Sequence, residues 1–151
     1  MSGPHEPPGA GERSARVPRM VLVTQFFPPE TGAGARRTGA MAAALRERFR
    51  LRVVTLEPGY PDASLYRRDE WQRTDRERGV AIERRRAFRP HDTSLLRRAL
   101  REIGMSLSLV VAAIRHRPAV LMVSTPSMFL APAGWLAARP EVDRVLHPGL
   151  E

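Results

Sequence analysis

The chain has 151 residues, 42% of them hydrophobic, which is enough for one domain with its own core. It has no cysteine, which excludes a disulfide framework and a thiolate metal site, and its four histidines lack ligand spacing, so we expect no metal. The net charge of +9 comes from arginine, since lysine is absent, and favours phosphate-bearing partners or an anionic membrane surface.

Nucleic acid is the rival partner for so basic a chain. We expect no nucleic acid, because aromatic residues make up only 6% of the sequence and do not alternate with the basic runs. Part of the charge also has a simpler interpretation as a solvated, arginine-rich surface.

Residues 1–18 are rich in proline, glycine and charge and show no apolar periodicity, which predicts a disordered tail. The tail has no apolar core of the kind found in secretion signals. Together with the missing cysteine, this favours a cytoplasmic location.

The run from Met20 to Phe27 is apolar, β-branched or aromatic, as expected for a strand buried on both faces of a parallel sheet. A loop follows, and then a helix whose apolar face is predicted from residues at helical spacing: Met41, Ala44, Leu45 and Phe49. The loop contains Gly32 and Gly34, which allow backbone to approach a ligand and permit positive φ.

This loop has the features of a phosphate cradle, because the first N–H groups of the helix point at whatever the loop holds. Arg36 and Arg37 stand at the positive end of the helix dipole, a conflict that an anionic ligand would relieve. A plain βα turn with solvated arginines is an equal alternative. A P-loop is excluded because the chain has no lysine, and a dinucleotide fingerprint is weakened by the misplaced glycines, although Glu57 sits where a ribose-binding acid would.

A second strand is predicted over 51–56, and a proline- and glycine-containing loop ends it. The charged stretch 62–78 has Tyr66 and Trp71 as its large anchors, and we expect a mobile surface segment with part of it helical. A short strand resumes near Val80, and Arg84 to Arg86 form a basic cluster at its end.

Asp92, Thr93 and Ser94 are candidate caps for a helix that reaches Arg115, before Pro118. Its apolar run of about twelve residues is shorter than the roughly twenty needed to span a bilayer. The favoured interpretation is a helix packed on a sheet. The alternative is a peripheral membrane helix, with membrane-facing arginines ahead of the apolar run: Arg97, Arg98 and Arg101.

The last buried strand is predicted over 119–123, and a helix over 128–139. The order of elements predicts an α/β fold, a Rossmann-like doubly wound parallel sheet that is incomplete. The first and last strands should then be neighbours at the topological switch point, where ligands collect. That arrangement would bring Thr125 and Ser127 opposite the glycine loop, although capping of the strand end is an equal role for them.

Three motifs in this order resemble the N-terminal half of a family 4 glycosyltransferase of surface-polysaccharide synthesis, over roughly residues 19–139: Pro28-Pro29-Glu30-Thr31-Gly32-Ala33-Gly34-Ala35 with Arg37, Leu56-Glu57-Pro58-Gly59-Tyr60-Pro61, and Ser124-Thr125-Pro126-Ser127. The resemblance implies the N-terminal, acceptor-side domain of a GT-B fold at 19–139. The irregular tail at 140–151 is predicted from the residues themselves, because the pattern of strands and helices ends at Pro140. The resemblance implies diphosphate or substrate contacts from Gly32, Gly34, Arg37, Glu30 and Thr125, with catalytic residues unknown.

The implied partners are a nucleotide-sugar donor, a lipid-linked acceptor at the inner face of the plasma membrane and a separately encoded C-terminal domain. No cofactor is implied, because the nucleotide sugar is a substrate. The second half of the family's pattern is missing from this sequence, so we expect no transfer activity from this chain alone. The alternative is a non-catalytic module that binds an anionic lipid-linked sugar.

Overall fold

Strands and helices alternate along the chain. The computed structural model describes residues 17–87, 94–124, 132 and 134–136. In chain order the elements are β1 (Arg19–Thr24), α1 (Ala33–Leu45), β2 (Arg50–Leu56), the short 3-10 helix η1 (Ala63–Leu65), α2 (Arg68–Glu77), β3 (Ala81–Arg85), α3 (Leu95–Ile114) and β4 (Val120–Ser124).

The four described strands form one parallel sheet in the order β3-β2-β1-β4. Strand β1 pairs with β2 on one side and with β4 on the other, with Leu22 opposite both Val53 and Met122. The order reverses between β1 and β4, so the predicted neighbours at the switch point are confirmed. The chain therefore has the predicted α/β, Rossmann-like fold in a small and incomplete form.

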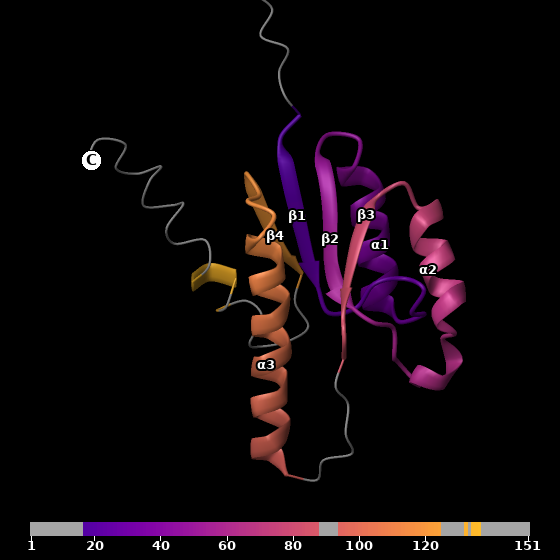
Figure 1. The fold of residues 1–151 in the computed structure, drawn as a ribbon, viewed down its shortest axis with the longest axis vertical. Helices are drawn as coiled ribbons and strands as arrows, with labels where there is room; N and C mark the ends of the chain where they lie inside the picture. The colour runs from indigo at the N-terminus through magenta and orange to yellow at the C-terminus, as the bar shows by residue number, and fades with distance from the viewer. Residues whose placement is uncertain (1–16, 88–93, 125–131, 133, 137–151) are drawn as a thin grey trace, which may run out of the picture.

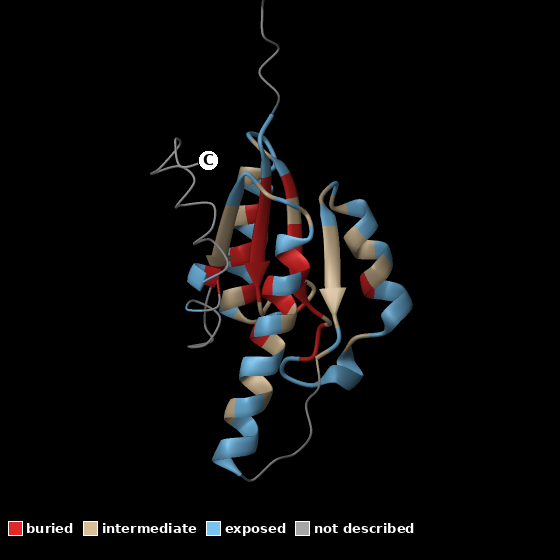
Figure 2. Ribbon diagram, turned by 60° about the vertical axis from the view of Figure 1, so that its left-hand side comes forward, coloured by how far each residue is buried: buried red, intermediate tan, exposed pale blue. Residues whose placement is uncertain are grey.

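Side chains of the central strand alternate between two apolar layers, because successive residues of a strand point to opposite faces. Val21 and Val23 pack with Leu109 and Ala113 of α3, and Met20 and Leu22 belong to the layer that includes Ala42 of α1. Helix α3 covers one face of the sheet, and α1 and α2 lie on the other (Figure 1). Burial is greatest in the central strands (Figure 2).

The charged stretch 62–78 is partly helical, as the sequence predicts, and it packs on the sheet through α2. It contains η1 and the ten-residue helix α2, and Trp71 of α2 is buried. Arg84 is not part of a solvated basic cluster, because it pairs with Asp75 of this helix. Most of the predicted helix at 128–139, the predicted tail at 1–18 apart from residues 17 and 18, and the whole predicted tail at 140–151 lie outside the described residues.

Candidate functional site at the carboxyl edge of the sheet

A cavity of about 270 Å³ lies where the β1–α1 loop meets the loop after β2. Both loops leave the carboxyl ends of their strands, the edge at which ligands collect in open α/β sheets. The lining is mainly apolar and consists of Phe26, Glu30, Gly32, Ala33, Gly34, Ala35 and Tyr60. The Phe26 and Tyr60 rings meet edge to face, with centroids 6.0 Å apart and planes at 65°.

Glu30 holds the two loops together from a site that is only 3% exposed. Its Oε1 accepts hydrogen bonds from Gly59 N–H and Tyr60 N–H, both at 2.9 Å. Its Oε2 accepts a longer one, 3.3 Å, from Phe27 N–H. The carboxylate therefore faces backbone amides of the protein, and it anchors the Tyr60 backbone at the cavity wall.

The opening turn of α1 forms the backbone side of the cavity. The first hydrogen bond within the helix runs from Arg36 N–H to the Gly32 carbonyl at 3.1 Å, so the amides of Ala33, Gly34 and Ala35 precede the helical pattern. No acidic residue stands in the first turn, and Gly32 offers no side-chain cap. The positive end of the helix dipole is thus directed at the cavity without a protein anion in that turn.

Neither glycine of this turn adopts a positive φ, which corrects the expectation that Gly32 and Gly34 serve a left-handed backbone conformation. Gly32 has φ −64°, and Gly34 has no φ in the left-handed region. A Cβ at Gly34 would meet nothing within 4 Å, and one at Gly32 would meet only the Tyr60 ring at 3.6 Å. What the two glycines provide is open space beside the helix amides.

The predicted site residues are only partly brought together. Gly32, Gly34 and Glu30 line the cavity. Arg37 is exposed on α1 and is not part of the lining. Thr125 lies outside the described residues. The sequence did not single out Phe26 or Tyr60 as site residues, because an aromatic residue next to a strand end is equally typical of the hydrophobic core. The loop Gly59-Tyr60-Pro61 was a signal for Tyr60.

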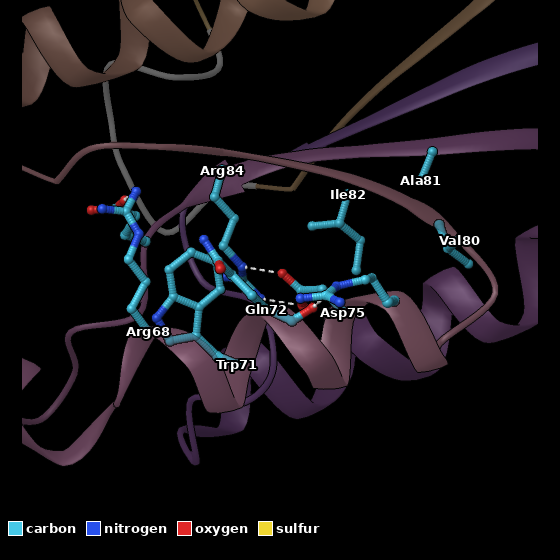
Figure 3. A pocket seen from close by; sticks show the side chains of 10 residues that line it. Arg68, Trp71, Gln72, Asp75, Val80, Ala81, Ile82 and Arg84 are labelled. Atoms are coloured by element: carbon cyan, nitrogen blue, oxygen red, sulfur yellow. Dashed lines mark hydrogen bonds and ion pairs between the residues drawn. The ribbon is translucent and has the colours of Figure 1, made fainter.

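A larger hollow, about 460 Å³, lies between α2 and β3, with Trp71 and Arg84 among its lining residues (Figure 3). The Arg84 guanidinium lies over the Trp71 ring at 5.2 Å and binds Asp75, and Arg68 pairs with Glu57 at 3.2 Å. Because these charged groups pair with one another, they join α2 to the sheet. We therefore assign no ligand to this hollow.

Within the described ranges, no three histidine, cysteine or acidic side chains gather in a way that would hold a metal ion. In the same part of the chain, no helix is long and apolar enough to cross a membrane.

Comparison with known proteins identifies no family for this chain. No family model matches the sequence, and no curated protein matches it. A solved structure that does match is a member of the universal stress protein family from Burkholderia pseudomallei, at 24% identity and a TM-score of 0.28. The match covers 72% of this chain and 97% of that one. A likeness this distant assigns neither an activity nor a ligand to the present chain.

These comparisons contradict the prediction of a family 4 glycosyltransferase and of its role in polysaccharide synthesis. No family model and no curated protein matches the chain, and the solved structure that matches is described as a universal stress protein. In the structure, two of the motifs behind the resemblance have a structural role. Glu30 and the Gly59–Tyr60 backbone occur together because they hydrogen-bond to each other. The partners implied by the resemblance stay untested predictions.

Proposed function

We propose that this chain is a binding module for a small organic anion, taken up in the carboxyl-edge cavity. The ligand class is a phosphate or carboxylate attached to a flat or apolar group. The observation that carries this proposal is the lining of the cavity, where the opening turn of α1 meets the Phe26 and Tyr60 rings. Glu30 also lines the cavity, and its carboxylate is bound by backbone N–H groups of Gly59 and Tyr60.

The anionic group belongs at the opening turn of α1. Amides that precede the helical hydrogen-bond pattern, together with the helix dipole, form a ready site for phosphate or carboxylate. Arg36 and Arg37 follow in the same turn and are both exposed, so they add positive charge around the site without lining it. An anion bound there would offset the unfavourable position of these two arginines at the helix N-terminus.

The remainder of the ligand belongs against the aromatic wall. Flat groups pack well on aromatic rings in offset or edge-to-face arrangements. At about 270 Å³ the cavity lies just below the usual range for ligand pockets, roughly 300–1,000 Å³, which limits the ligand to a small molecule. The open space beside Gly34 extends the room for a group that approaches the backbone.

A titration followed by amide NMR tests the proposal with three probes: phenyl phosphate, inorganic phosphate and phenol. Phenyl phosphate carries both parts of the ligand class, whereas phosphate and phenol each carry one. We expect phenyl phosphate to bind more tightly than either fragment and to shift the amides of Ala33, Gly34, Ala35 and Tyr60.

The variant Gly34→Leu places a side chain in the cavity and should abolish these shifts. Its matched control is Gly104→Leu, at a helical glycine of α3 that also has nothing within 4 Å and lies outside the cavity lining. Shifts that persist in Gly34→Leu, or shifts that phosphate alone produces equally at many sites, would contradict the proposal.

We also infer a cytoplasmic location for this binding module, at the inner face of the plasma membrane. The support is compositional: a chain without cysteine suits a reducing compartment, and a charge of +9 suits an anionic membrane face. Fractionation of cells that express the full chain, with protease added to intact and to lysed cells, tests this inference.

A further inference from the structure

Helix α3 divides into a packed half and a projecting half. Its buried residues, from Ser106 onward, lie on the sheet. The first turns of the helix extend past the carboxyl ends of the strands, in two views related by a turn about the vertical axis (Figures 1 and 2). We call residues 95–101 the α3 tip.

The lengths of the elements explain why the tip projects. Helix α3 has 20 residues, which corresponds to about 30 Å. Strands β1 and β2, on which it packs, have 6 and 7 residues, which corresponds to about 20–23 Å. The helix is therefore longer than the sheet beneath it, and the excess lies at its N-terminal end.

The α3 tip exposes large apolar side chains next to arginines. Leu95 is 83% exposed, Leu96 69% and Leu100 60%. Arg97 and Arg98 are exposed as well. A leucine exposed to this degree is unremarkable when single, but several in a row mark an interaction surface. The tip combines that apolar surface with a cluster of positive charge.

The apolar and basic side chains surround the helix axis. At about 100° per residue, the leucines at 95, 96 and 100 spread over about 140° of the circumference, and Arg97 and Arg98 occupy much of the rest. A protein partner with one complementary face would meet only part of this set. A fluid lipid surface can receive leucines in its acyl boundary while arginines reach the headgroups around them.

We propose that the α3 tip docks the domain on an anionic lipid surface. The leucines enter the boundary between headgroups and acyl chains, and Arg97 and Arg98 bind lipid phosphates. Charge complementarity selects this occupant: the chain has 25 basic and 16 acidic residues, and the tip itself carries arginines and no acid. The proposal is independent of what the cavity binds, although both features lie at the carboxyl edge of the sheet.

A second copy of the chain is a weaker occupant of this surface. An exposed apolar stripe continues along the whole of α3, which is the pattern of a helix–helix contact, through Ile103, Leu107, Val111 and Ile114. However, the helix contains three arginines and one glutamate, all near its N-terminus, so two copies packed with their α3 helices parallel would bring like charges together. Exposure of the apolar side chains is also greatest at the tip, beside the arginines, and falls toward the packed half.

Vesicle sedimentation with the full chain tests the proposal. The vesicles are phosphatidylcholine alone and an equimolar mixture of phosphatidylcholine with phosphatidylglycerol, each at low and at high salt. We expect binding to the anionic vesicles only, weakened by salt. Leu95→Gln with Leu96→Gln should reduce it about tenfold or more for each leucine. Arg97→Gln with Arg98→Gln should reduce it about thirtyfold, because each basic residue at such a surface contributes about a factor of five.

The controls lie at the opposite edge of the sheet: Val17→Gln, at a residue that is 58% exposed, for the loss of one exposed apolar side chain, and Arg48→Gln with Arg50→Gln for the loss of two exposed arginines. Circular dichroism should show an unchanged fold in all variants, since every altered side chain is exposed. Three results would overturn the proposal: equal binding to neutral vesicles, equal losses in the two arginine pairs, or no binding at all. So would a dimer in sedimentation velocity that the tip leucine variants convert to a monomer, because a second copy would then cover this surface.

Discussion

Arg84 of β3 and Asp75 of α2 form a two-point ion pair, with Nε to Oδ2 at 2.6 Å and Nη2 to Oδ1 at 2.8 Å. The pair is withdrawn from solvent, with side-chain exposures of 3% and 12%. The same guanidinium donates to the Leu56 carbonyl at 3.0 Å and to the Pro28 carbonyl at 2.6 Å. One arginine therefore joins α2 and the end of β2 to the loop that leads into the cavity.

Removing Arg84 should destabilise the domain strongly. Arg84→Met preserves side-chain length but leaves Asp75 with an uncompensated, mostly buried charge, so we expect a loss of about 3–5 kcal/mol in the free energy of unfolding. Urea denaturation measures it. The neighbouring Arg85→Met is the control, because Arg85 is 40% exposed and pairs with Glu83 only at 3.8 Å, which is worth about 1 kcal/mol or less. Equal losses in the two variants would contradict the central role of Arg84.

Glu30 should act on the order of the cavity wall as well as on stability. In Glu30→Gln the buried side chain keeps one acceptor oxygen and loses its charge, so we expect a loss of about 1–3 kcal/mol. Hydrogen exchange of the Gly59 and Tyr60 amides should accelerate, since both donate to this carboxylate. Glu77→Gln is the control at an exposed carboxylate whose pairing with Arg73 is at 4.0 Å. Unchanged exchange at Gly59 and Tyr60 would show that these amides are held by something else.

Two glycines of α1 should respond to alanine in opposite directions. A Cβ at Gly39 would lie 2.7 Å from Cγ of Pro28, so the proline ring or the helix must shift, and we expect Gly39→Ala to destabilise by about 1–3 kcal/mol. Gly34→Ala adds a methyl group to open space and improves helix propensity, for a gain of about 0.5–1 kcal/mol. Thermal unfolding of the two variants compares them directly. A Gly39→Ala variant as stable as the parent chain would contradict the packing of α1 against Pro28, and a destabilised Gly34→Ala variant would contradict the open space beside Gly34.

Asp62 should titrate below the usual value for an aspartate. Its carboxylate accepts a hydrogen bond from Ser64 N–H at 2.9 Å, and this bond, with a smaller contribution from the Ser64 side chain, lowers the pKa. Because the folded-state pKa is depressed, the stabilisation is present above the pKa of the unfolded chain and is lost as the pH falls through the folded-state value.

Carboxyl-carbon NMR of Asp62 measures this pKa against that of a short peptide with the same sequence. In Ser64→Ala the pKa should rise only part of the way, since the backbone N–H is retained. An Asp62 pKa equal to that of the peptide would mean that η1 is not capped by this side chain in solution.

Local patterns were sufficient for the framework of this protein. Apolar runs over 20–27, 51–56 and 119–123 predicted three of the buried strands, and helical spacing predicted α3 nearly to its ends. The neighbouring positions of β1 and β4 followed from the order of elements, because short right-handed connections leave few topologies open. The strands and α3 depend on residues that are close in sequence, and the pairing of β1 with β4 depends on the order of the elements, which is why the sequence alone determined them.

The roles of individual side chains were decided by the tertiary structure. Arg84 appears in the sequence within a basic run, and only the packing of α2 against β3 shows that it pairs with Asp75. Glu30 reads as a candidate ligand-binding residue, yet its partners are amides about thirty residues away. The α3 tip is apolar in sequence like the packed half, and only the mismatch between helix length and strand length exposes it. In each case the deciding quantity is a distance between segments far apart in the chain, which no local pattern contains.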